Sequence, residues 1–168
     1  ALERFEAARG PDRRFSLLRL QREAGTDGKH LWRHPEQLLR GWEAATGCPI
    51  IEGWGMSEGA PINMNPLHGT RKLLSVGPTP PETEIDVVDV ATGTQVLGPN
   101  ESGEIRVRGK QFTQGYRNRP EENARALRDG WLYTGDIGYF DADGYLFLVD
   151  RKKDMALVGG YNVYPREI

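Results

Sequence analysis

In the first half of the chain, the apolar residues follow a helical spacing. This spacing predicts a helix over Ala1 to Arg9, and the apolar run Phe15 to Leu20 predicts a short buried strand. A second helix is expected to open at Pro35 and to end at Gly47, because proline suits the first helical turn and glycine suits the stop. The residues expected to form its buried stripe are Leu38, Leu39, Trp42 and Ala45.

The segment after this helix combines a brief apolar run with a cluster of glycines. Pro49-Ile50-Ile51 is short enough for a buried strand, and it leads into G-W-G-M-S-E-G, residues Gly53 to Gly59. In α/β sheets, ligands gather at the carboxyl ends of strands. We therefore expect Gly53 to Gly59 to form a ligand-binding loop at the end of a strand.

From Ser75 onward the pattern changes to short strands. Glu84 to Val90 alternates in part, with Ile85, Val87 and Val90 on one face, and Glu104 to Gly109 alternates throughout. A helix is expected over Pro120 to Arg128, followed by a hairpin whose turn is Asp-Ala-Asp-Gly, between Tyr139-Phe140 and Tyr145 to Val149. The predicted organisation is an α/β part (1–74), a β-rich subdomain (75–150) and the start of a further domain (151–168).

Composition excludes some function classes. The 168 residues carry 22 basic and 24 acidic side chains, a net charge of -2, which argues against non-specific binding to nucleic acid or to a membrane surface. No apolar run approaches the roughly 20 residues that span a bilayer. The single Cys48 excludes an internal disulfide, is expected to be a small buried residue, and suits a reducing, cytoplasmic compartment.

Two groups of polar residues are candidates for chemistry. In the Gly53 to Gly59 segment, Trp54 offers a flat face for a base, Ser57 a hydroxyl for a phosphate, and Glu58 a hard oxygen ligand for Mg²⁺. A surface turn with a capping serine explains the same residues, and on these residues alone it is favoured. Asp136, after the turn Thr134-Gly135, can accept hydrogen bonds from the two hydroxyls of a ribose or from the amides of its own turn.

Other candidates are weaker. Asp141 and Asp143 share the Asp-x-Asp-Gly spacing of a calcium loop, but no helices flank them and the last ligand position is not glutamate, so a hairpin turn is favoured. His30 and His34 lie four residues apart without the glutamate of a zinc-protease motif, which makes metal binding unfavoured.

Three motifs, in order, resemble those of acyl-CoA synthetases and other adenylate-forming enzymes: G-W-G-M-S-E-G, W-L-Y-T-G-D with R-K-K-D, and G-G-Y-N-V-Y-P. The resemblance implies that Ser57 and Glu58 are catalytic, with Glu58 also the Mg²⁺ ligand, and that Lys153 is the hinge to a small C-terminal domain. It also implies a set of residues that bind nucleotide or coenzyme A: Gly53, Trp54, Gly55, Met56, Ser57, Asp136, Arg151, Gly159 and Gly160.

The implied fold is α/β plus a β-rich subdomain, the C-terminal part of the large N-terminal domain of such an enzyme, ending just past the hinge. The implied reaction joins a fatty or other hydrophobic acid to coenzyme A with ATP and Mg²⁺. The chain is expected to be an internal piece that is inactive alone. An amino-acid-activating domain and a non-catalytic nucleotide-binding relic are the alternatives. Arg22-Glu23-Ala24-Gly25 stands where the family usually has a glycine-glycine-alanine turn, so the resemblance does not specify the acid substrate. The oligomeric state is open as well.

Overall fold

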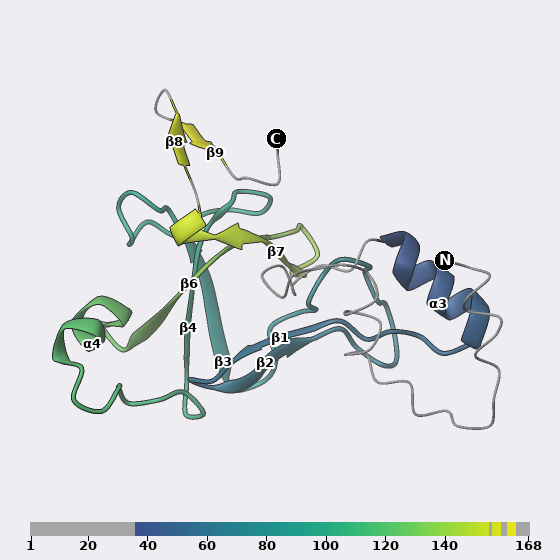
Figure 1. The fold of residues 1–168 in the computed structure, drawn as a ribbon, viewed down its shortest axis with the longest axis horizontal. Coiled ribbons are helices and arrows are strands. Elements are labelled where there is room, and N and C mark those ends of the chain that lie inside the picture. The colour runs from purple at the N-terminus through teal and green to yellow at the C-terminus, as the bar shows by residue number, and fades with distance from the viewer. Residues whose placement is uncertain (1–35, 155, 159–160, 164–168) are drawn as a thin grey trace. The chain divides into compact units, whose positions relative to one another are not determined.

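The structure of the protein is a computed structural model that describes residues 36–154, 156–158 and 161–163 (Figure 1). The chain divides into two compact units, residues 1–50 and 51–168, each of which is described by itself. The boundary predicted between residues 74 and 75 stays a prediction. Several expectations lie outside the described residues: the helix Ala1 to Arg9, the run Phe15 to Leu20, His30, His34 and the opening of the second helix at Pro35.

The described part of the first unit contains helix α3, Glu36–Thr46. The predicted stop is correct: Gly47 has a φ of 69°, and its amide donates to the carbonyl of Glu43 at 2.8 Å. The buried stripe is narrower than predicted, because Leu39 is fully buried while Ala45 is exposed. Cys48 was expected to be buried and is exposed, since it follows Gly47, where the chain has already left the helix.

The second unit begins with a hairpin where the sequence predicted a strand and a loop. Pro49-Ile50-Ile51 is not a strand: proline has no backbone N–H, and the Ile50 amide donates to the side chain of Glu43 at 3.2 Å rather than to a ladder. Instead, β1 (Gly53–Met56) pairs antiparallel with β2 (Ala60–Met64), and the chain turns at residues 57–59. The predicted loop Gly53 to Gly59 is therefore half strand and half turn, with a β-bulge between Trp54 and Gly55.

A five-stranded antiparallel sheet forms the body of the second unit. Its strands are β3 (Thr83–Val88), β4 (Gly103–Gly109), β5 (Leu127–Arg128), β6 (Trp131–Phe140) and β7 (Leu146–Arg151). β6 is the central strand: it pairs with β4 along one edge and with β7 along the other (Figure 1), and the short β5 pairs with its first residues on the same edge as β7.

Most of the predicted strands and turns in this sheet are confirmed. β4 and the hairpin between β6 and β7 lie where the pattern placed them. β3 ends at Val88, so Val90 is not part of the strand. Helix α4 (Pro120–Ala126) ends earlier than predicted, because Leu127 and Arg128 pair with β6 as β5.

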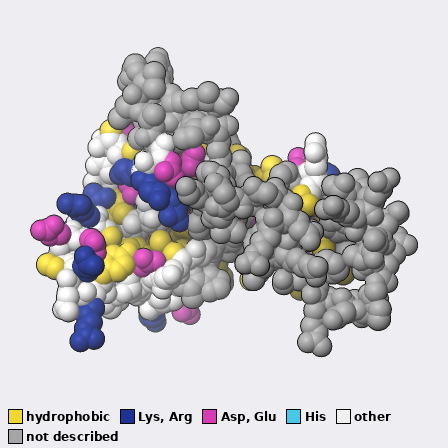
Figure 2. All heavy atoms as spheres, in the orientation of Figure 1, with side chains coloured by type: hydrophobic (Ala, Val, Ile, Leu, Met, Phe, Trp, Pro, Cys, Tyr) yellow, Lys and Arg dark blue, Asp and Glu magenta, His cyan; other side chains and the backbone are white. Residues whose placement is uncertain are grey.

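The alternation of β4 gives the sheet one apolar face and one charged face. Ile105 and Val107 are fully buried, whereas Arg106 and Arg108 lie over the Trp131 ring, at 4.4 and 4.5 Å from its centre. Arg106 donates to Asp86 at 2.7 Å, and Arg108 pairs with Glu84. Figure 2 shows basic and acidic side chains close together on the face of the molecule that it draws.

The sheet leads into the C-terminal segment through a short 3-10 helix, η1 (Lys152–Asp154). Lys152 donates to the carboxylate of Glu104 at 2.6 Å, and Glu104 is only 4% exposed, so the start of η1 is tied to the core strand β4. β8 (Ala156–Val158) and β9 (Tyr161–Val163) then form a two-stranded ribbon. In the described part of the chain no helix is both long and apolar enough to cross a bilayer.

Candidate functional site

Asp136 lies at a β-bulge in the middle of β6. The pairing with β4 shifts register between Glu104 and Arg106, and Gly135 has a φ of 72° at this point. The Thr134 hydroxyl donates to the Ile105 carbonyl at 2.8 Å and accepts from the Asp136 amide at 3.1 Å. The sequence predicted a turn at Thr134-Gly135; the structure has a bulge inside a continuous strand, which re-aims the side chain of Asp136.

Three predicted residues meet at this bulge. The Trp54 indole N–H donates to Asp136 Oδ2 at 3.0 Å, across 82 residues of sequence, and Arg151 Nε lies 3.2 Å from Asp136 Oδ1. Trp54 is 2% exposed and Asp136 6% exposed. Desolvation by burial raises the pKa of Asp136, and the Trp54 hydrogen bond and the Arg151 charge offset only part of that rise.

The carboxylate of Asp136 still has acceptor capacity. A carboxylate offers about four lone-pair sites; the Trp54 indole N–H uses one of them, and the Arg151 guanidinium lies at ion-pair distance. Two neighbouring hydroxyl groups could donate hydrogen bonds to the remaining lone-pair sites of Asp136. The corner formed by Trp54, Asp136 and Arg151 therefore holds a buried carboxylate beside a cation, and such a carboxylate can accept hydrogen bonds from a sugar diol.

The other end of the hairpin holds Glu58. Its side-chain Oε1 accepts a hydrogen bond from the Tyr116 hydroxyl at 2.8 Å, and its backbone carbonyl accepts from the Thr113 amide at 2.7 Å. Burial, followed by the contact with Glu58, raises the pKa of Tyr116 to about 12, so the phenol is a donor at neutral pH. Ser57, next to Glu58 in the turn, is exposed.

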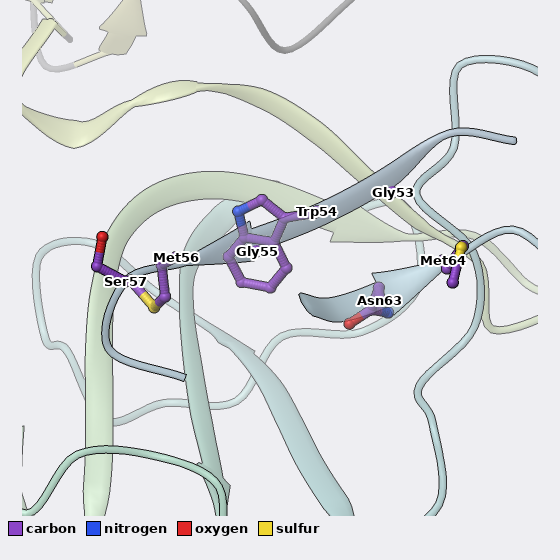
Figure 3. Close-up of a pocket in the computed structure, with 7 residues that line it drawn as sticks. All are labelled: Gly53, Trp54, Gly55, Met56, Ser57, Asn63 and Met64. Atoms are coloured by element: carbon purple, nitrogen blue, oxygen red, sulfur yellow. The ribbon is translucent and has the colours of Figure 1, made fainter. Parts of the chain in front are cut away.

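An open pocket of about 640 Å³ lies along the hairpin (Figure 3). It is lined by the predicted residues Gly53, Trp54, Gly55, Met56 and Ser57, and by Asn63 and Met64 of β2, which the sequence did not single out. Asn63 lies opposite Trp54 in the ladder and donates to the Pro78 carbonyl at 3.1 Å. The pocket thus runs beside the Trp54 ring, whose N–H is bound to Asp136.

The remaining predicted residues separate into three cases. Lys153 is exposed in η1. Gly159 and Gly160, between β8 and β9, lie outside the described residues. Asp141 serves its own turn, as predicted, because its Oδ1 accepts from the amides of Asp143 and Tyr145 at 3.0 and 2.9 Å.

Sequence reasoning missed Tyr116. It is 58 residues from Glu58, in a loop between β4 and α4. No periodicity or motif links the two positions. Only a sheet that brings this loop to the hairpin turn reveals the contact.

The residues present are compatible with a magnesium ion held mainly by a substrate. The described residues contain no group of three or more His, Cys, Asp or Glu side chains that could enclose a metal. Mg²⁺ bound to a nucleotide needs only one or two protein carboxylates, since phosphate oxygens and water complete its shell. Glu58, with one oxygen bound by Tyr116 and the other not used in that bond, fits this role.

Comparison with known proteins defines the class. The family model described as AMP-binding enzyme matches residues 33–117, about half of the chain. The chain therefore belongs to the AMP-binding enzyme family, and the resemblance drawn from its motifs is confirmed. Its mixed α and β architecture with antiparallel sheets matches that of the N-terminal domain of adenylate-forming enzymes.

Individual relatives agree with this assignment. The chain is 44% identical over 135 residues to a long-chain-fatty-acid–CoA ligase of Bacillus subtilis, a match that covers 80% of this chain and 24% of that protein. It is similar to ATP-bound MatB from Rhodopseudomonas palustris (TM-score 0.72, 38% identity, 77% of this chain and 26% of that one). It is also similar to the O-succinylbenzoate coenzyme A synthetase MenE of Bacillus subtilis in complex with AMP (TM-score 0.69, 34% identity, 80% and 28%). The chain spans about a quarter of the length of the curated relatives it matches.

Proposed function

We propose that this chain supplies part of the nucleotide site of an ATP-dependent acid–CoA ligase. The observation that carries the proposal is the corner at the β6 bulge, where Trp54 and Arg151 bind the buried carboxylate of Asp136. Names of relatives support the reaction class, since those matched include long-chain-fatty-acid and 2-succinylbenzoate CoA ligases. The acid is a fatty or other hydrophobic acid, and the single free Cys48 suits a cytoplasmic setting.

The proposed reaction has two steps. First, an oxygen of the carboxylate substrate attacks the α-phosphorus of ATP; an O–P bond forms, the bond to the β-phosphate oxygen breaks, and pyrophosphate leaves. Second, the sulfur of coenzyme A attacks the acyl carbon; a C–S bond forms, the bond to the AMP oxygen breaks, AMP leaves with that electron pair, and the thiol proton is released. Positioning and charge neutralisation provide most of the catalysis in such phosphate chemistry.

Each residue has a part in this scheme. Asp136 accepts from the ribose hydroxyls, Arg151 holds Asp136 and contacts the nucleotide, and the buried Trp54 forms part of the wall of the hairpin pocket beside adenine. Ser57, exposed at the turn, donates to the α-phosphate, and Glu58 holds Mg²⁺. When bound, the ion supplies positive charge against the phosphate oxygens.

The second step uses the C-terminal segment. Lys153 is the proposed pivot for a small C-terminal domain, and the exposed position of this lysine in η1 supports that role. Gly159 and Gly160 are proposed to line the passage for the pantetheine arm of coenzyme A, because glycine lets a ligand approach the backbone closely. We propose further that residues 1–168 alone do not catalyse either step.

Exchange of labelled pyrophosphate into ATP tests the first step. The chain alone should give no exchange above background, whereas a full-length ligase that contains this sequence should exchange only when the acid is present. In that ligase, Glu58→Ala should suppress exchange at least 100-fold, roughly the effect of losing one key charge-stabilising contact. Unchanged exchange in Glu58→Ala would remove Glu58 from the adenylation site.

The two half-reactions can be separated in the same protein. Gly160→Leu should leave pyrophosphate exchange near wild type and slow transfer from acyl-adenylate to coenzyme A. Slowing of the exchange alone would show that the glycine pair is not part of the thiol passage. ATP binding by calorimetry without turnover would instead favour a non-catalytic relic, and transfer to a carrier-protein thiol rather than to coenzyme A would favour an amino-acid-activating domain.

A further inference from the structure

A loop outside the family-like motifs is built around Glu58. It comprises residues Phe112 to Tyr116, between β4 and α4, and is called here the Glu58 brace. Its Thr113 amide binds the Glu58 carbonyl at 2.7 Å, and its Tyr116 hydroxyl binds Glu58 Oε1 at 2.8 Å. Backbone and side chain of the same glutamate are thus both fixed by one loop.

Packing holds the brace against the hairpin turn. Phe112 is 7% exposed, and its ring lies so close to Gly59 that a β-carbon at residue 59 would overlap it. Glycine at position 59 therefore permits the close approach that brings Tyr116 within hydrogen-bonding distance of Glu58. The contact depends on shape as well as on the hydrogen bond.

The far end of the brace is fixed by helix α4. Asn123 accepts from the Tyr116 amide at 2.6 Å and donates to the Tyr116 carbonyl at 2.9 Å. This two-way pairing leaves the Tyr116 backbone little freedom. The ring is consequently held where its hydroxyl meets Glu58, rather than reaching it as a mobile surface side chain.

A donor fixed on one carboxylate oxygen determines the direction of the other. With Oε1 engaged by Tyr116, rotation of the Glu58 carboxylate would break a hydrogen bond, so Oε2 keeps one orientation. Hydrogen-bond partners of metal-binding carboxylates act in this way: they orient the ligand, and their loss weakens metal binding.

We propose that Tyr116 is a positioning residue that orients the Glu58 carboxylate for the nucleotide-bound divalent cation, with Asn123 holding Tyr116 in place. This proposal rests on the role of Glu58 proposed above. Tyr116 lies outside the motifs assigned to the nucleotide site, and its proposed role acts through Glu58. Tyr116 restricts the orientations of the Glu58 carboxylate before the cation binds together with ATP.

Direct cation binding tests the proposal. The sample is a full-length ligase containing this sequence with a non-hydrolysable ATP analogue, and Mn²⁺ replaces Mg²⁺. Electron paramagnetic resonance then measures the concentration of free Mn²⁺. Tyr116→Phe should raise the Kd of Mn²⁺ for the protein–analogue complex about 10-fold, the lower end of the effect expected for such a partner. The Kd of the analogue without metal should stay within 2-fold of wild type.

Matched variants make the result specific. Tyr139→Phe removes a hydroxyl from a ring that stacks on Phe147 and should leave the Mn²⁺ Kd unchanged. Asn123→Ala should shift the Kd in the same direction as Tyr116→Phe, and by less. In Glu58→Gln, adding Tyr116→Phe should have no further effect, because the oriented group is gone.

Two outcomes would overturn the proposal, and they differ. If Glu58→Gln weakens Mn²⁺ binding but Tyr116→Phe matches Tyr139→Phe, the brace has no positioning role while the proposed function stands. If Glu58→Gln itself leaves Mn²⁺ binding unchanged, the proposed metal role of Glu58 fails, and the positioning role fails with it.

Discussion

The two ends of the β6–β7 pair hold aspartates in opposite environments. Asp136, at the bulge end, is buried, and its side-chain partners Trp54 and Arg151 come from other elements. Asp141, at the turn end, binds the amides of its own turn and the ammonium of Lys72. Trp54 reaches Asp136 across 82 residues of sequence and Arg151 lies opposite it in the ladder, whereas Asp141 accepts from two amides within four positions of it.

Their pKa values move in opposite directions. Desolvation raises the pKa of Asp136 more than its two partners lower it. At Asp141, desolvation is outweighed by the Lys72 ion pair and the turn amides, which lower the pKa below its usual range. A carboxylate that only shapes a turn stabilises the fold in its charged form. A buried carboxylate with a raised pKa opposes folding when charged, and its presence favours a functional explanation.

The largest expected effect comes from removing the charge at the bulge end. In a full-length ligase containing this sequence, Asp136→Asn should lower kcat/KM for ATP about 100-fold, because two hydrogen bonds from ribose to a charged acceptor are weakened. The matched change Asp141→Asn should stay within about 2-fold, a difference well under 1 kcal/mol. Equal losses in the two variants, measured by steady-state kinetics at saturating acid, would erase the functional distinction between the two ends.

A second buried carboxylate sharpens the comparison. Glu104 is as buried as Asp136, but it has a lysine partner, Lys152, at 2.6 Å. Lys152→Met should lower the free energy of unfolding by about 3 kcal/mol, since the buried charge loses its partner. Lys153→Met, at the exposed neighbouring position, should change it by no more than about 0.5 kcal/mol. Urea unfolding that gives the same midpoint for both variants would show that burial of Glu104 does not depend on the pair.

The sequence predicted the local features of both ends, but it did not predict the contacts between residues far apart in the chain. The Asp141 turn follows from Asp-Ala-Asp-Gly, because its hydrogen bonds join residues within four positions of each other. The alternation of Ile105, Arg106 and Val107 likewise defined β4. Such features depend on neighbours in the chain, which a pattern records.

The errors have physical reasons as well. Gly53 to Gly59 was expected to be a ligand-binding loop at the end of a strand, but pairing with β2 makes its first half a strand, although glycine is rare in strands. The hydrogen bond from Trp54 to Asp136 was not predicted, because it joins residues 82 positions apart. Tyr116 was missed altogether, because the contact with Glu58 exists only once β4 and the hairpin are assembled.

A smaller effect is expected at the turn end. Asp141→Ala removes the acceptor of two turn amides and the partner of Lys72, and should lower the free energy of unfolding by about 1 kcal/mol. Asp143→Ala should have less effect, because its side chain is 73% exposed and pairs only with Lys72. A loss at Asp143 as large as at Asp141 would mean that the lysine, rather than the turn, stabilises the hairpin.

The smallest expected effect is a difference in how the free energy of unfolding changes with pH. The folded-state pKa of Asp136 lies above the 3.8 of an ordinary aspartate, so protonation of Asp136 favours the folded state. This contribution to stability is complete below pH 3.8 and is lost as pH rises through the folded-state pKa. Asparagine does not titrate. The free energy of unfolding of Asp136→Asn, relative to that of wild type, should therefore increase as pH rises from about 4. For Asp141→Asn the sign reverses, because a lowered pKa contributes stability that is present above 3.8 and lost as pH falls. Urea unfolding of the three proteins between pH 3 and 7 measures both slopes, and parallel curves for the two variants would contradict the assignment of opposite environments.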